Sequence, residues 1–181
     1  MTGRILIVPG LHDSGPGHWQ SWLESVLPET HKVRQSDWER PHLPTWAGAL
    51  LRDIDRQSGP VWILAHSFGC LATVAAGLSD GERILGALLV APADPARFGS
   101  AASLIDGRLS FPSLLIASTS DPWLSADAAQ RWARVWGSQY RTIGAAGHIN
   151  VASGFGPWPE VLDHFASLQK IGQRACRIRI A

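Results

Sequence analysis

The sequence has few cysteines and no long apolar run. Only 2 of its 181 residues are cysteine, too few for the disulfide framework of a small secreted protein. No segment approaches the roughly 20 apolar residues that a membrane-spanning helix needs, and the apolar run at residues 5–8 is too short for the core of a signal peptide. These absences exclude a disulfide-stapled peptide and a helical membrane protein. We therefore expect a cytoplasmic protein.

Charged residues are also scarce, at 17% of the chain, and 16 basic against 15 acidic side chains leave a net charge of +1. Nucleic acids and anionic membranes attract strongly basic surfaces, so this balance gives no reason to expect either as a partner. Apolar residues make up 45% of the sequence, which is enough for a core. The length fits one domain, since domains usually span about 100–200 residues.

Short apolar segments alternate with segments of helical pattern along the whole chain. Apolar runs ending in Gly, Pro, Ser or Asp predict buried strands at residues 5–8, 61–65, 84–91 and 114–117, with weaker candidates at 31–35 and 139–143. Helices are predicted between them at residues 19–27, 46–56, 68–78, 126–136 and 159–168. This alternation is typical of βαβ units and predicts an α/β fold, a three-layer doubly wound and mainly parallel sheet of about six strands.

The chain shows no composition shift that would mark a domain boundary, so we expect a single domain over residues 1–169. The remaining segment, residues 170–181, contains four basic residues and no acidic one. It is predicted to be a flexible basic tail, with an edge strand at residues 177–180 as the alternative. Only about twenty residues lie between the strand ending at residue 91 and Phe111, so no cap domain is expected.

One serine lies where a strand turns directly into a helix. The strand at residues 61–65 leads into Ala65-His66-Ser67-Phe68-Gly69, and an apolar helix follows. Small residues two positions before and after a serine allow the sharp turn of a nucleophile elbow, which predicts Ser67 as a nucleophile. A polar cap on the following helix is the alternative. Ser79 fits the G-x-S-x-G pattern better but follows a helix, so we interpret it as a helix stop.

A nucleophilic serine needs a base, and the base needs an acid to orient it. In a parallel sheet these partners follow the carboxyl ends of other strands. Asp121 follows the strand at 114–117, and His148 ends a glycine-rich loop after the strand at 139–143. The order Ser67, Asp121, His148 is that of the α/β-hydrolase triad. Asp94, which also follows a strand, is the alternative acid.

Two backbone N–H groups usually stabilise the oxyanion of such a reaction. The predicted donors are Phe68, which follows the nucleophile, and Leu11, in the loop after the first strand. His12 is a second candidate for the amide donor; its ring could instead contact substrate, or it could be a plain turn residue.

The same loop admits two weaker interpretations. Gly10, Gly15 and Gly17 lie between a strand and a helix, as in phosphate-binding loops, and Asp37 could contact a ribose, but the spacing matches neither nucleotide motif. A metal site from His12, Asp13 and His18 would use ligands from one loop only. We therefore expect no cofactor and no metal.

Several of these segments together resemble a known family, the small lidless α/β-hydrolases of the retinoblastoma-binding-protein-nine type, in particular bacterial members. The resemblance covers most of the chain and rests on residues 8–11 and 15–19, the elbow at 66–69, residues 120–122, and residues 147–150 with 154–158. It implies a serine hydrolase with Ser67, Asp121 and His148 as its triad. The segment after Lys170 has no counterpart in it.

Taken together, these features predict a serine hydrolase that cleaves a small-molecule or peptide-like ester, thioester or amide through an acyl-enzyme on Ser67. A non-catalytic binding protein on the same scaffold and an acyltransferase with the same triad are the alternatives. The 9 tryptophans also need a role. Those in loops near the candidate site are predicted to help His12 line the substrate site: Trp19, Trp38, Trp123 and Trp158. Trp62 is expected in the core, and Trp132 and Trp136 against the sheet or a partner subunit.

Overall fold

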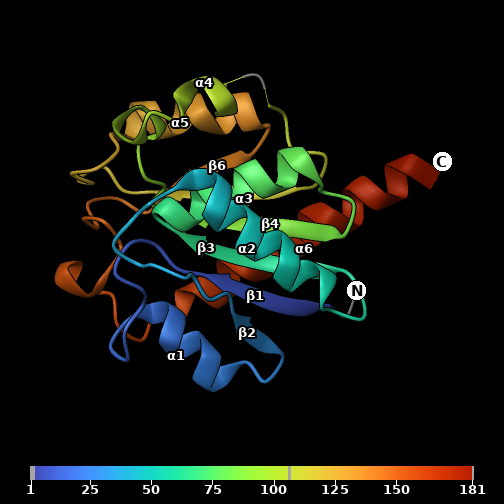
Figure 1. The fold of residues 1–181 in the computed structure, drawn as a ribbon, viewed down its shortest axis with the longest axis horizontal. Helices are drawn as coiled ribbons and strands as arrows, with labels where there is room; N and C mark the ends of the chain where they lie inside the picture. Colours follow the sequence, from blue (N-terminus) through green and yellow to red (C-terminus); the bar gives the residue numbers. More distant parts are fainter. Residues whose placement is uncertain (1–2, 106, 181) are drawn as a thin grey trace.

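The computed structural model describes residues 3–105 and 107–180 (Figure 1). A parallel sheet of six strands forms its centre, in the order β2-β1-β3-β4-β5-β6. The strands are β1 (Arg4–Val8), β2 (Thr30–Lys32), β3 (Val61–His66), β4 (Ile84–Val90), β5 (Ser113–Ala117) and β6 (Gln139–Thr142). Because every strand runs in the same direction, all carboxyl ends meet at one edge of the sheet.

Helices cover both faces of this sheet (Figure 1). On one face α1 (Trp19–Val26) and α6 (Glu160–Ile180) belong to an apolar cluster that includes Ile5 and Ile7 of β1. On the other face α2 (Leu43–Asp55), α3 (Phe68–Ser79) and α5 (Ala126–Trp136) belong to a second apolar cluster, which includes Leu6 and Val8 of β1. Side chains alternate between the faces of a strand, so burial on both faces requires the uninterrupted apolar runs seen in the sequence. The predicted three-layer α/β fold is confirmed.

The winding of the chain reverses at β1, which lies between β2 and β3. Ligands of doubly wound sheets bind outside the carboxyl ends of the strands at such a reversal. In the described residues between β4 and β5, the helices are the short η1 (Pro95–Phe98) and α4 (Ala101–Leu104). The expectation of no cap domain is confirmed, and this edge carries only loops and short helices.

Two elements begin earlier than predicted. α2 starts at Leu43 rather than at residue 46, with Pro44 in its first turn, a position where proline is favoured because its fixed φ suits a helix start. The strand β2 covers Thr30–Lys32, whereas the sequence predicts residues 31–35.

The segment predicted as a flexible basic tail is helical, because α6 continues without a break to Ile180. The proposed boundary between residues 169 and 170 falls inside this helix, and residues 177–180 form no edge strand. Gly172 lies in α6 beyond this boundary, and a Cβ there would lie 3.3 Å from Trp62 and 3.6 Å from Pro112. Because glycine has no side chain, the helix can lie close to the sheet at this residue. Ala181 lies outside the described residues.

Three further tryptophans lie in or against the core, Trp62 as predicted and Trp132 and Trp136 on α5. Trp62 is buried on β3. Trp132 and Trp136 stack with their ring centroids 5.3 Å apart, and the fully buried Trp136 donates to Leu104 O. None of the helices in the described part of the chain has the length and apolar content required to cross a membrane.

Candidate active site

Backbone strain is concentrated at the carboxyl edge of the sheet. Among the described residues, every non-glycine residue with positive φ follows a strand at this edge: His12, Asp13, Ser67, Ala91 and Ile149. Such conformations cost of order 1–3 kcal/mol each and gather at functional sites. The strain therefore points to the same edge as the reversal in strand order.

Ser67 lies at the turn between β3 and α3, with φ 53° and ψ −124°. The turn is possible because Ala65 is small and buried and because Gly69 has no side chain. A Cβ at Gly69 would overlap Val8 O and Pro9 O. The Ser67 carbonyl accepts a hydrogen bond from Cys70 N–H at 3.0 Å, which closes the first turn of the helix. This local geometry directs the hydroxyl away from the sheet.

The structure brings Ser67, His148 and Asp121 into one chain of hydrogen bonds. The distance between Ser67 Oγ and His148 Nε2 is 2.9 Å. His148 Nδ1 lies 2.9 Å and 3.0 Å from the two carboxylate oxygens of Asp121, and the Asp121 side chain is only 2% exposed. An ionised carboxylate only accepts hydrogen bonds, so Nδ1 carries the imidazole proton and Nε2 presents a lone pair to the hydroxyl.

Asp94, the alternative acid, has a different role in the structure. Its carboxylate accepts a hydrogen bond from Ala96 N–H at 3.0 Å and caps η1. Of the two acids weighed from the sequence, Asp121 is the one beside His148.

Serines that the sequence analysis did not select hold the loop of His148. Ser153 Oγ accepts a hydrogen bond from His148 N–H at 3.1 Å. Two serines after β5 accept hydrogen bonds from the residues before His148: Ser118 from Ala146 at 2.9 Å, and Ser120 from Gly147 at 3.0 Å. In the sequence, the only sign of these contacts is that Ser118 and Ser120 lie just before Asp121. Serines are too common in loops for this position to be informative.

The two predicted oxyanion donors belong to segments that meet at the nucleophile. Phe68 is the first residue of α3, and N–H groups in a first helical turn have no acceptor within the helix. Gly10, just before Leu11, lies so close to Ser67 that a Cβ there would be 2.7 Å from Ser67 Cβ and 3.2 Å from Oγ. The alternative donor is wrong, because His12 N–H already donates to Trp38 O at 3.1 Å.

The approach of Gly10 to Ser67 gives a testable prediction. Gly10→Ala should lower kcat at least tenfold, because the new methyl group displaces the hydroxyl from His148. Gly15→Ala, in the same loop, has no atom within 4 Å of the added Cβ and serves as the matched control. Ester hydrolysis by both variants is measured beside their thermal unfolding. Equal activity in the two folded variants would contradict the prediction.

The structure corrects part of the predicted tryptophan wall. Trp19 is fully buried and donates to Ile149 O at 3.0 Å, and the buried Trp158 packs against it. Both belong to the core, because loop 148–151 folds down onto the start of α1. Trp38 is half-buried against Trp46. Trp123, in contrast, is 49% exposed, with its ring centroid 6.2 Å from that of His148.

The residues considered for a nucleotide site or a metal site have other partners in the structure. The exposed His12 ring pairs with Glu39 at 2.9 Å. His18 Nδ1 accepts a hydrogen bond from Gln20 N–H and caps α1, and burial lowers its pKa to about 4, helped by nearby Lys32. Asp37 accepts a hydrogen bond from Glu39 N–H within a turn. These contacts stabilise the loops locally.

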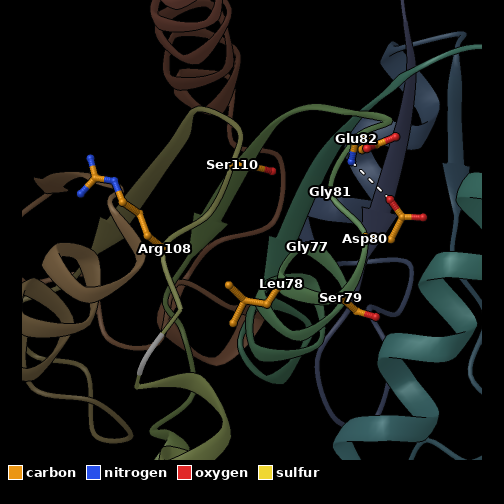
Figure 2. A pocket seen from close by; sticks show the side chains of 8 residues that line it. All are labelled: Gly77, Leu78, Ser79, Asp80, Gly81, Glu82, Arg108 and Ser110. Carbon is orange, nitrogen blue, oxygen red and sulfur yellow. Dashed lines mark hydrogen bonds between the residues drawn. The ribbon is translucent and has the colours of Figure 1, made fainter.

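Ser79 lies in a separate surface hollow of about 500 Å³ near the far end of α3 (Figure 2). It follows Ser67 by twelve positions along α3, roughly 18 Å at 1.5 Å per residue. Its lining contains no histidine: Gly77, Leu78, Ser79, Asp80, Gly81, Glu82, Arg108 and Ser110. Ser79 ends α3, as the sequence predicts.

This fold, with a strand-turn-helix serine beside a histidine and an acid at the carboxyl edge, defines an α/β-hydrolase. Comparison with known proteins gives the family: residues 5–167 match the family described as Serine hydrolase. The chain belongs to this serine hydrolase family. Among curated proteins, none matches the chain.

Solved structures agree with this assignment. A protein described as a YdeN-like hydrolase from Pectobacterium atrosepticum is 40% identical, with a TM-score of 0.89 over 93% of this chain and 91% of that one. The ydeN gene product from B. subtilis is 19% identical, with a TM-score of 0.76 over 92% and 98%. Est1E from Butyrivibrio proteoclasticus, solved with ferulic acid, is 12% identical, with a TM-score of 0.68 over 96% and 89%.

The last two likenesses concern the fold alone. The family match and the 40% identical structure establish a small serine hydrolase of the α/β-hydrolase type. The likeness to the retinoblastoma-binding-protein-nine type stays a prediction.

Proposed function

We propose that this hydrolase cleaves a carboxylic ester, thioester or amide through an acyl-enzyme on Ser67. The observation that carries the proposal is the unbroken chain of hydrogen bonds from Ser67 Oγ through His148 to Asp121. A serine hydroxyl is a weak nucleophile unless a positioned base removes its proton. Here the base lies within hydrogen-bond distance, and its tautomer is set by a nearly buried carboxylate.

In the first half-reaction Ser67 Oγ attacks the substrate carbonyl carbon while His148 Nε2 takes the hydroxyl proton. The carbonyl oxygen becomes an oxyanion that accepts hydrogen bonds from the N–H groups of Phe68 and Leu11. The intermediate then collapses: the bond to the leaving group breaks, and the leaving group takes the proton from His148 Nε2. Asp121 holds Nδ1–H throughout and stabilises the imidazolium.

In the second half-reaction water attacks the acyl carbon and gives its proton to His148 Nε2. The ester bond to Ser67 breaks, the acid leaves, and the proton returns to Ser67 Oγ. Every step uses a side chain or backbone N–H of this chain, and the proposal includes no cofactor. With no cap domain over the carboxyl edge, we expect small substrates, or larger ones held by one end beside Trp123 and His12.

Rapid mixing with a p-nitrophenyl ester tests this proposal. We expect a burst of p-nitrophenol equal to the concentration of folded protein, followed by slower turnover, because acylation releases the phenol before water releases the acid. Glycerol or hydroxylamine added to the assay distinguishes hydrolysis from acyl transfer: predominant formation of the new ester or hydroxamate would favour an acyltransferase. Binding of the ester without release of phenol would contradict the proposal and favour a binding protein.

A further inference from the structure

A second histidine lies directly behind the candidate base. His66 is the last residue of β3, immediately before Ser67, and its side chain is buried. Its Nε2 lies 2.9 Å from the backbone oxygen of His148, and the two rings lie with their centroids 5.0 Å apart. The residue before the nucleophile therefore contacts the main chain of the residue proposed to activate it.

The chemistry of this contact fixes the form of His66. A carbonyl oxygen only accepts hydrogen bonds, so His66 Nε2 must carry a proton. Burial lowers the pKa of His66 well below its ordinary value, and the neighbouring His148 and His18 lower it further. These two histidines face it from the loop after β6 and from the start of α1, with ring centroids 5.0 Å and 4.9 Å away. His66 is thus a neutral donor with a bare Nδ1.

The main chain around His148 is held on both sides. Ser153 accepts the hydrogen bond of His148 N–H, and His66 donates to its carbonyl. Ile149, the next residue, has φ 49°, a conformation that its branched side chain disfavours. A strained turn directly after the base keeps its geometry only if surrounding contacts fix it, and the His66 contact acts on the peptide unit between these two residues.

We propose that His66 is a positioning residue that holds the His148–Ile149 peptide, so that the His148 ring bridges Ser67 and Asp121. This inference rests on the proposed function, in which His148 is the base. A neutral donor suits the role, because the imidazolium formed on His148 during the reaction then has no second positive charge behind it.

Two substitutions at His66 separate positioning from packing. His66→Leu fills a similar volume without a donor, whereas the amide nitrogen of His66→Gln can take the place of Nε2. We expect the leucine variant to lose about 10- to 100-fold in kcat with KM unchanged, the same size of loss as when the partner that orients a metal-binding histidine is removed. The glutamine variant should recover most of this loss.

Ser113→Ala is the matched control, since it also removes a hydrogen bond from a buried side chain, to Ser138 at 2.7 Å, but at the amino end of β5. Its kcat should stay at the wild-type value. Full activity of His66→Leu, or equal loss in the leucine and glutamine variants with thermal unfolding unchanged, would overturn the inference.

A measurement on the unaltered protein keeps the inference testable if the variants do not fold. Nitrogen-15 NMR of the imidazole rings should find His66 neutral and protonated on Nε2 from pH 6 to 8. A charged ring or the Nδ1–H tautomer would overturn the inference. Failure of the proposed function looks different, because the wild-type protein would then give no p-nitrophenol burst, whatever the tautomer of His66.

Discussion

Ser67→Ala protein should fold as the wild type does and lose ester hydrolysis by about 10⁶-fold, the loss expected when the serine of a triad is removed. The change deletes one oxygen atom from a half-buried residue. Its hydrogen bond to His148 is lost, but the strained turn and the packing of α3 remain. Ser79, the other serine of elbow-like pattern, cannot take over, since it lies in the separate hollow of Figure 2.

Steady-state assays of p-nitrophenyl ester hydrolysis measure this loss, and thermal unfolding of both proteins provides the control for folding. Residual activity within tenfold of the wild type would contradict the assignment of Ser67 as the nucleophile.

Asp121→Asn should have the second largest effect, lowering kcat by about 10⁴-fold. The side chain keeps its shape, but an amide presents one acceptor oxygen and one NH₂ donor to His148 Nδ1. The donor favours the tautomer with a bare Nδ1 and a proton on Nε2, which leaves no lone pair for the Ser67 hydroxyl. The effect should therefore fall on kcat, with little change in thermal unfolding.

Asp94→Asn is the control for this prediction, because Asp94 also follows a strand at the carboxyl edge but caps η1. An asparagine accepts the same hydrogen bond from Ala96 N–H, so its kcat should stay at the wild-type value. A large loss of kcat in the Asp94 variant together with a small loss in the Asp121 variant would assign the role of the acid to Asp94 instead.

The fold and the main elements of the site could be predicted because each depends on a local pattern or a rule of topology. The elbow at Ser67 is encoded within a few residues, as a buried strand, small neighbours and an apolar helix. Asp121 and His148 follow two further strands, and parallel strands bring their carboxyl ends to one edge. The structure places the three side chains within hydrogen-bond distance, and their catalytic roles stay predictions until variants are assayed.

Features that depend on contacts between distant segments could not be predicted. Trp19 looks like a wall residue in the sequence, but its N–H donates to Ile149 O, 130 positions away, and this contact buries it. The close approach of Gly172 in α6 to Trp62 and Pro112 is another such contact, and no helical pattern contains it. The contact of His66 with the main chain of His148 likewise joins segments that lie 82 positions apart.

Covalent labelling tests the central claim most directly. Wild-type protein is treated with a fluorophosphonate, and the added mass is located by peptide mass spectrometry. We expect one phosphonyl group on Ser67, no labelling of Ser67→Ala, and a labelling rate reduced at least a hundredfold in His148→Ala. Absence of labelling in folded wild-type protein, or a label on another serine that survives in Ser67→Ala, would contradict the account.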